Sequence, residues 1–209
     1  MPYLCHPPIK LMIQALPVTE HSVEVEADFW LPFFAHAQRL PIHEAIFAGR
    51  PTVRISRSWL RSENLNLEVR AAATILWGYP KGARGARHSH WLANLAQIAA
   101  AADTRDLSWG DYYQKLHSIG ELGISTISKL AYGFSQKFHG HPALILDQRI
   151  LAVLSSGRWS DLVGLPNINY VTASAHYVDY LALLAGIAVA GSFSSEQLEF
   201  FLFTLGNSF

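Results

Sequence analysis

Apolar residues recur at helical spacing along most of this chain, and this periodicity constrains the fold more than any other feature of the sequence. In the segment 58–78, for example, Val69 and Ala72 belong to an apolar stripe on one face of a helix. Half of the residues are hydrophobic and 15% are charged, which is typical of a packed globular chain. We find no convincing pair of strands and predict an all-α fold.

Proline, glycine and capping residues divide this pattern into elements. We expect helices over 22–40 (kinked or restarted at Pro32), 58–78, 91–103, 109–118, 125–138, a segment that follows Asp147, 173–190 and 194–205. The predicted caps are Asp106 or Ser108, Asp147, and Ser194 or Ser195. A basic, glycine-containing loop is expected over 79–90, and an extended link over 143–146.

Cysteine and histidine usage argues against a metal or a disulfide framework. Cys5 is the single cysteine, so the sequence offers no Cys-ligated zinc or iron–sulfur site. The histidine pairs His88/His90 and His139/His141 have a spacing of two, which on a helix points the rings apart. We therefore expect no metal and no cofactor.

Charge is unevenly distributed although the formal net charge is zero. Residues 49–90 carry eight Lys and Arg side chains against Glu63 and Glu68, a balance of +6, whereas the segments on either side are mildly acidic. A basic segment of this kind is compatible with an edge that faces phosphates, and equally with a solvated charged face.

Nothing in the sequence indicates a membrane protein. The N-terminus lacks the charged-then-apolar order of a signal peptide. The most apolar stretch, 180–191, is shorter than the roughly 20 residues that span a bilayer. We expect a cytoplasmic protein with no membrane partner.

The stretch 116–154 carries the most informative motif. It reads as a helix, a tight turn, a second helix, and an aspartate that caps the helix after it. This order resembles the helix-hairpin-helix DNA glycosylases, such as endonuclease III and the 8-oxoguanine DNA glycosylases. Lys129 lies 18 residues before Asp147, as in the endonuclease III pattern. The residues GHPALILD at 140–147 match the family's G-x-P-x-x-x-V-D, with Leu146 in place of valine.

This resemblance implies a fold and an activity. It is close over about 40 residues and weaker over 75–209. It implies one glycosylase unit over 1–209, with two helical lobes and a cleft between them. The lobes would comprise 1–105 with the C-terminal helices, and a helix-hairpin-helix lobe at 106–165. The implied activity is excision of an oxidised or otherwise modified base, with abasic-site lyase activity.

The chemistry of base excision suits the two matched residues. Lys129 would attack the deoxyribose anomeric carbon and form a Schiff base, which requires its neutral amine. Placement at the start of a helix and partial burial both favour that form. Asp147 would stabilise the developing positive charge and manage protons. The target base would have to leave the duplex to be reached.

DNA contacts are expected from the hairpin and from the basic loop. The family's hairpin L-P-G-x-G-x-K is here G-I-S-T-I-S-K, which keeps Gly123 and substitutes hydroxyls for the glycines. Backbone N–H groups at such a helix start can hold a phosphate. The expected DNA-binding residues are Gly123, Ser125, Thr126, Ser128, Lys81, Arg84, Arg87, His139 and His141.

A base-reading pair is implied near the C-terminus. In the 8-oxoguanine enzymes a Gln and a Phe four residues apart close on the flipped base, and Glu199 and Phe203 have this spacing here. A carboxylate in place of the amide would favour a base edge rich in N–H donors, or would carry a raised pKa. Trp77 is a further candidate for the base pocket. Alternatively, Glu199 is a charged residue on a helix, and Phe203 and Trp77 are aromatic residues of the core.

The expected partner is double-stranded DNA that contains a modified base or an abasic site, bound by a monomer. One alternative is a non-catalytic helix-hairpin-helix DNA-binding protein, with phage defence as a possible context. The other alternative is a helical interaction protein of a phage-defence system, for which DNA is incidental. The sequence leaves open which base is removed.

Overall fold

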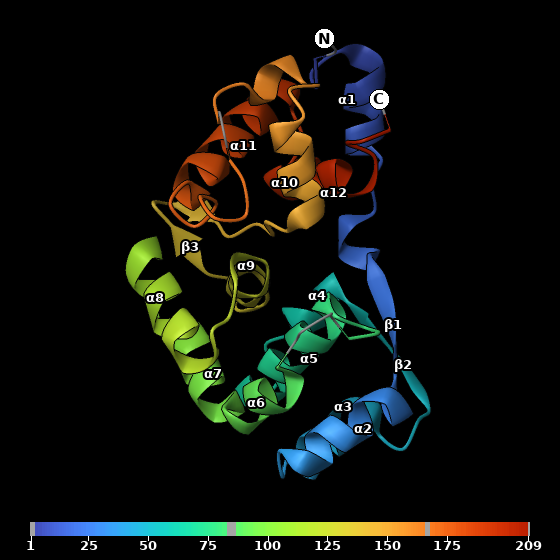
Figure 1. The fold of residues 1–209 in the computed structure, drawn as a ribbon. Helices are drawn as coiled ribbons and strands as arrows, with labels where there is room; N and C mark the ends of the chain where they lie inside the picture. Colours follow the sequence, from blue (N-terminus) through green and yellow to red (C-terminus); the bar gives the residue numbers. More distant parts are fainter. Residues whose placement is uncertain (1–2, 83–86, 166–167, 209) are drawn as a thin grey trace.

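The computed structural model describes residues 3–82, 87–165 and 168–208, and most of them are helical (Figure 1). The helices are α1 (Pro7–Gln14), α2 (Ala27–His36), α3 (Leu40–Phe47), α4 (Arg57–Leu60), α5 (Leu67–Gly78), α6 (His88–Ala93), α7 (Leu95–Ala102), α8 (Trp109–Gly120), α9 (Ile124–Gly133), α10 (Gln148–Ser155), α11 (Tyr177–Gly191) and α12 (Ser195–Thr204). The described ranges also contain the short 3₁₀ helices η1 (Val18–Glu20) and η2 (Ser160–Leu162). The mostly helical fold predicted from the periodicity is confirmed.

Helix packing brings the two ends of the chain together. α12 packs against α1, α10 and α11, and both termini lie at the same end of the molecule (Figure 1). α5 lies centrally and packs against α3, α7 and α9. In the described part of the chain no single helix is long and apolar enough to cross a bilayer, and α11 with α12 passes that test only as a pair bent by 104°.

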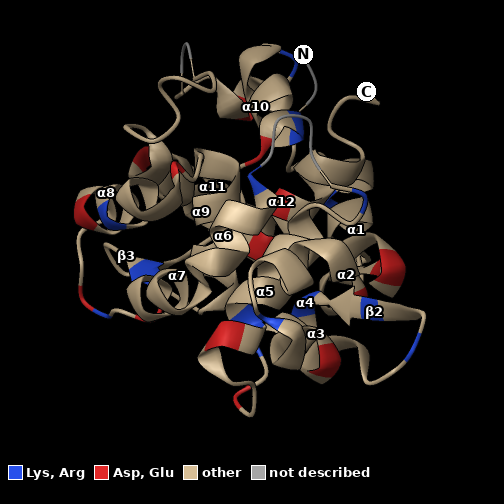
Figure 2. Ribbon diagram, turned by 60° about the horizontal axis from the view of Figure 1, so that its bottom comes forward, with Lys and Arg blue, Asp and Glu red and all other residues tan. Residues whose placement is uncertain are grey.

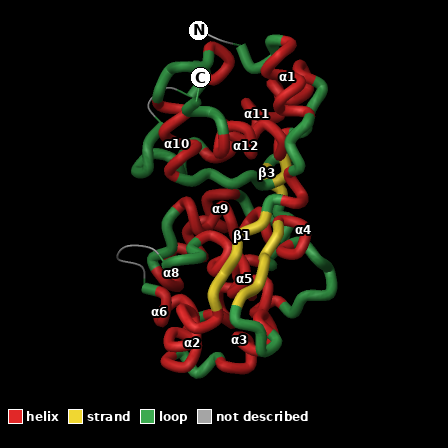
Figure 3. The backbone as a smooth tube through the Cα atoms, turned by 90° about the vertical axis from the view of Figure 1, so that its right-hand side faces the viewer, coloured by secondary structure: helices red, strands yellow, loops and turns green. Residues whose placement is uncertain are grey.

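Two antiparallel strand pairs correct the prediction of a chain without strands. β1 (Ser22–Glu26) pairs with β2 (Thr52–Ser56), so the segment 22–40 is a strand followed by α2 and not one helix (Figure 3). The sequence SVEVE alternates with a period of two, and the side chains of Val25 and Ile55 are fully buried beneath the ribbon. The local spacing of this segment also fits a helix, but strand pairing buries one of its faces, and this burial determines the structure.

Two predicted helices are shorter than expected. The segment 58–78 is divided into α4 and α5, because the side chain of Asn66 caps a new helix by accepting a hydrogen bond from the Glu68 N–H (2.8 Å). The segment 125–138 ends as a helix at Gly133. It continues into a hairpin of β3 (Lys137–Phe138) and β4 (His141–Pro142), whose turn residues His139 and Gly140 both have positive φ.

Three predicted helix starts are confirmed by their caps. Ser108 accepts from the N–H of Asp111 at the start of α8, and Ser194 forms a capping box with Gln197 at the start of α12. Asp147 caps α10. The link at 143–146 is extended, as predicted. The lobe boundaries at 105 and 165, and the cleft between lobes, stay predictions.

Candidate active site

Lys129 lies on the buried face of α9, where α9 packs against α5, and its side chain is only 6% exposed. Its Nζ donates hydrogen bonds to the Oγ of Ser125 (2.6 Å) and to the Ser125 carbonyl oxygen (3.3 Å). The amine also lies 5.9 Å from the centre of the Tyr79 ring. These contacts hold a long, flexible side chain in one position.

The pKa of the Lys129 amine is lowered from its ordinary value, because burial disfavours the ammonium form. The carboxylates of Asp147 and Glu199 oppose this effect, and the Arg57 guanidinium adds to it. At a given pH the fraction of neutral amine is therefore higher at Lys129 than at a solvent-exposed lysine. A nucleophilic lysine requires this neutral form.

Asp147 is fixed by the helix that it caps. Its Oδ1 accepts from the backbone N–H groups of Arg149 (3.0 Å) and Ile150 (3.2 Å). Among the described residues no donor is recorded for Oδ2, so this oxygen is available to a ligand. A capping carboxylate is held rigidly, and the role of cap is compatible with one in catalysis.

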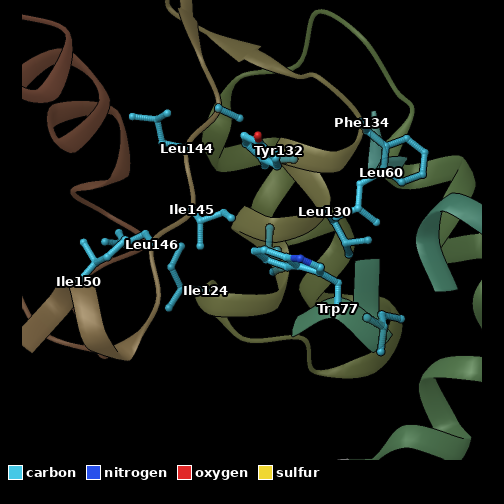
Figure 4. Packing of buried hydrophobic residues seen from close by; sticks show 14 of the residues in the cluster. Leu60, Trp77, Ile124, Leu130, Tyr132, Phe134, Leu144, Ile145, Leu146 and Ile150 are labelled. Carbon is cyan, nitrogen blue, oxygen red and sulfur yellow. The ribbon is translucent and has the colours of Figure 1, made fainter. Parts of the chain in front are cut away.

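The extended link before Asp147 is tied to α9 and α11. The Oγ of Ser128 accepts from the Leu146 N–H (3.0 Å), which joins the link to the helix that carries Lys129. On the other side, the hydroxyl of Tyr180 donates to the Ile145 carbonyl (2.9 Å). Figure 4 shows Ile145 and Leu146 on this link beside α9, with Trp77 of α5 close by. The link therefore sets the position of Asp147 relative to Lys129.

Lys129 and Asp147 line the same cavity, which has a volume of about 380 Å³. This lies within the range of about 300–1,000 Å³ that is common for small-molecule sites. Its wall combines residues from both ends and the middle of the chain: His21, Val23, Arg57, Trp77, Gly78, Pro80, Lys129, Ile145, Asp147, Arg149, Glu199 and Phe203. The three residues proposed for a base pocket, Trp77, Glu199 and Phe203, are among them.

Glu199 is bound by Arg57, and burial raises the pKa of its carboxyl group, the second of the two consequences expected for a glutamate at this position. Both of its oxygens accept from Arg57, Oε2 from Nη1 (2.6 Å) and Oε1 from Nη2 (3.1 Å). Glu199 is fully buried and Arg57 is 1% exposed. Although burial alone would lower the pKa of Arg57, the Glu199 carboxylate raises it above its ordinary value, so the guanidinium stays charged.

Aromatic rings enclose the Arg57 guanidinium. Its Cζ lies 5.2 Å from the ring centres of Tyr132 and Phe200 and 5.7 Å from that of Trp77. At the cavity mouth, the exposed Arg149 lies over the Phe203 ring at 4.9 Å. Arg57 and Arg149 thus place positive charge in and beside the cavity, although neither was predicted from the sequence as a site residue.

His21 also lines the cavity and was not predicted from the sequence as a site residue. It lies between η1 and β1, and its ring packs near Phe200 (4.6 Å between ring centres) and Trp77 (5.5 Å). Burial, together with the Arg57 charge, lowers the pKa of His21 to about 4, so the ring is neutral at physiological pH. No local motif marks this histidine, because its neighbours in the cavity come from distant parts of the chain.

The hairpin hydroxyls mostly have partners inside the protein. Thr126 is buried and its Oγ1 hydrogen-bonds the Tyr79 hydroxyl (2.7 Å), and Ser128 is fully buried against Leu146. We therefore assign these two side chains a structural role in place of the expected contact with DNA. Ser125 holds the Lys129 amine. Gly123 is the N-cap of α9, after a short turn from α8, and its role in binding a phosphate stays a prediction.

Arg87, near the end of the basic loop, and Trp91 of α6 contact this turn. Arg87 forms a 2.8 Å ion pair with Glu121, and the indole N–H of Trp91 donates to the Gly120 carbonyl (3.0 Å). Lys81 is exposed, and Arg84 lies outside the described residues. Lys and Arg also occur on β2 and α4, and α8 carries both signs of charge (Figure 2). A phosphate-binding role for Lys81 and Arg87 stays a prediction.

The remaining histidines lie outside the cavity. His139 is exposed in the β3–β4 turn and His141 is half-buried on β4, so neither of them lines the cavity with Lys129. His88 is buried on α6, not in a loop as expected. In the described ranges no group of three or more His, Cys, Asp or Glu side chains is arranged to hold a metal ion.

The fold and the site define a mostly helical protein with a buried amine and a fixed carboxylate in one ligand-sized cavity. The chain belongs to the family described as "Putative 8-oxoguanine DNA glycosylase OGG-like protein", whose model matches residues 16–203. The match confirms the resemblance stated from the motif at 116–154, and it extends to the segment that contains His21. No curated protein and no solved structure matched the chain.

Proposed function

We propose that this protein is a DNA glycosylase with abasic-site lyase activity that excises an oxidised or otherwise modified base resembling 8-oxoguanine. The observation that carries the proposal is that Lys129 and Asp147 line one cavity, with the amine buried and its pKa lowered. Membership of the 8-oxoguanine DNA glycosylase-like family supports the same reaction class.

In the proposed reaction, the neutral Lys129 amine attacks C1′ of the nucleotide. The bond between C1′ and the base breaks, and the base leaves with the bonding electrons and takes up a proton. As positive charge develops on the sugar, the Asp147 carboxylate stabilises it. Opening of the sugar ring gives a Schiff base between Lys129 and C1′. Loss of a C2′ proton then expels the 3′ phosphate and cleaves the strand.

DNA would approach the side of the protein where the cavity opens. The exposed Arg149 lies beside the opening, and Lys81 follows the end of α5, whose residues Trp77 and Gly78 line the cavity. The α8–α9 turn, with Gly123 at its end, would hold a backbone phosphate through N–H groups. This arrangement predicts salt-dependent binding of duplex DNA.

Borohydride trapping on a duplex with one abasic site tests the proposal. We expect a covalent adduct with the wild-type protein and none with Lys129→Ala. Lys115→Ala is the matched control, because Lys115 is an exposed lysine on α8 outside the cavity and should leave the adduct unchanged. An adduct that persists in Lys129→Ala contradicts the assignment of the nucleophile. Salt-dependent binding without any adduct would support the non-catalytic DNA-binding alternative.

A further inference from the structure

His21 is held by Arg57 through both backbone and side chain. The Arg57 N–H donates to the His21 carbonyl oxygen (3.0 Å), and the Arg57 Nε donates to the His21 Nδ1 (3.4 Å). Arg57 is itself fixed, because its Nη1 and Nη2 both bind Glu199. Three of the guanidinium donors therefore have fixed partners, and one of those partners is the His21 ring.

This contact determines which nitrogen of His21 carries the proton. A guanidinium only donates hydrogen bonds, so the Nδ1 that faces it has to be the unprotonated acceptor. In a neutral ring the proton is then on Nε2. Among the described residues Nε2 has no hydrogen-bond partner, and this atom is not fully buried. His21, which lines the cavity, therefore carries a neutral N–H donor without a partner among these residues.

The polarity of the cavity follows from this arrangement. Both oxygens of the Glu199 carboxylate already accept from Arg57, whereas the His21 Nε2–H has no partner among the described residues. The rings of Trp77 and Phe200 pack against the His21 ring and Arg57 holds its Nδ1, so the donor direction is restricted before a ligand binds. A ligand group that approaches the ring has to offer an acceptor, because a second N–H there would leave two donors facing each other.

We propose that His21 determines base specificity by donating its Nε2–H to a carbonyl oxygen or unprotonated ring nitrogen of the extruded base. This inference rests on the proposed glycosylase function and deepens it. It assigns base selection to a histidine from the N-terminal segment, positioned by Arg57 and Glu199. Bases that present an amino group at this point would be rejected, and bases that present a carbonyl would be accepted.

The test compares two reactions that differ in whether a base is present. One is single-turnover excision from a duplex that contains 8-oxoguanine or hypoxanthine. The other is borohydride trapping on a duplex whose abasic site is already formed. His21→Phe keeps an aromatic ring against Trp77 and Phe200 but removes the donor. His21→Gln keeps an amide N–H donor, together with an oxygen that can accept from Arg57.

We expect His21→Phe to lower excision roughly 10- to 100-fold, the range for a lost hydrogen bond in a desolvated site. His21→Gln should restore much of that loss. Trapping on the abasic duplex should be unchanged in both variants, because no base has to be read. An independent readout is the long-range ¹H–¹⁵N spectrum of the histidine rings, with His21 assigned by its absence in His21→Phe. It should show a neutral ring protonated on Nε2 at pH 7.

Two results would overturn the inference while the glycosylase proposal stands. One is excision by His21→Phe at the wild-type rate. The other is an equal loss of excision and trapping, which would make His21 a structural residue of the cavity. A ring protonated on Nδ1, or a wild-type protein that traps the abasic site but excises neither base, would overturn it too. Absence of both reactions in the wild-type protein would overturn the proposed function, and the inference with it.

Discussion

The Cα of Gly78, at the end of α5, lies directly against the Lys129 side chain on α9. A Cβ at position 78 would lie 2.8 Å from Cδ and 3.3 Å from Cε of Lys129. Atoms at 2.8 Å would overlap, so the lysine chain has to move when a methyl group is added there. The absence of a side chain at Gly78 therefore provides the space through which the Lys129 amine reaches the cavity.

We predict that Gly78→Ala lowers the rate of Schiff-base formation at least about tenfold, because a displacement of the amine near 1 Å is expensive in a preorganised site. Stability should change by less than about 1 kcal/mol, because a flexible lysine chain yields easily and alanine favours the helix. The measurement is borohydride trapping, together with urea denaturation.

Gly186→Ala is the matched control. Gly186 is also helical, and a Cβ there would meet nothing within 4 Å. We expect a gain of roughly 0.5–1 kcal/mol from the better helix propensity of alanine and unchanged trapping. Wild-type trapping by Gly78→Ala would show that the two residues are not coupled in this way.

The pH dependence of the lyase step should report the Lys129 amine. Because its pKa is lowered in the folded protein, the rate should rise with pH and reach its plateau below the ordinary lysine value of 10.5. As pH falls through the lowered pKa, the ammonium form returns and activity is lost. Single-turnover strand cleavage of an abasic duplex between pH 6 and 10 measures this profile. A rate that still rises tenfold per pH unit up to pH 10 would contradict a desolvated amine.

Asp147→Asn separates the two roles of the aspartate. Asparagine caps a helix about as well as aspartate, so the free energy of unfolding should stay within about 0.5 kcal/mol of the wild type, whereas Asp147→Ala should cost about 1 kcal/mol. The Asp147 charge also raises the pKa of Lys129, so Asp147→Asn should move the pH midpoint further down. Base excision should nevertheless fall, because the carboxylate that stabilises the sugar cation is gone.

Base excision at the wild-type rate in Asp147→Asn would leave Asp147 as a helix cap only. A midpoint that does not move would mean that the carboxylate does not act on the amine. Thermal denaturation of the two variants beside the wild type checks that the cap survives in the asparagine protein.

The parts of the site that the sequence predicted are close together in the chain. Lys129 and Asp147 are separated by one helix end, one hairpin and one extended link, and each of these has a local signal in capping residues, glycine or proline. The caps Ser108, Asp147 and Ser194 were predictable for the same reason, since a cap depends on residues within one turn.

The rest of the site depends on contacts between distant residues. Arg57 and Glu199 are 142 positions apart, and each alone looks like a surface charge on a helix. His21 reaches the cavity because β1 pairs with β2 across α2 and α3, and the sequence gives no sign of that pairing beyond two short alternating stretches. The pairing itself determines how His21 and Arg57 meet, so neither residue could be assigned to the site beforehand.

The buried Arg57–Glu199 pair should contribute strongly to stability only while both partners are present. Glu199→Ala would leave the guanidinium charged and buried without a counterion, which typically costs about 3–5 kcal/mol. Replacing both partners, as in Arg57→Met with Glu199→Leu, should cost much less, because no isolated charge remains. Urea denaturation of the three proteins measures this difference.

The exposed pair Arg87–Glu121 provides the comparison for that experiment. Its side chains are 56% and 67% exposed, so Glu121→Gln should change stability by less than about 1 kcal/mol despite the 2.8 Å contact. If Glu199→Ala destabilised the protein as little as Glu121→Gln, the Arg57 guanidinium would have to be bound by another partner or by solvent. The fixed positions of Arg57 and of the His21 ring would then no longer follow from the ion pair. A loss of several kcal/mol that the double variant largely recovers would instead show that Glu199 serves to hold Arg57.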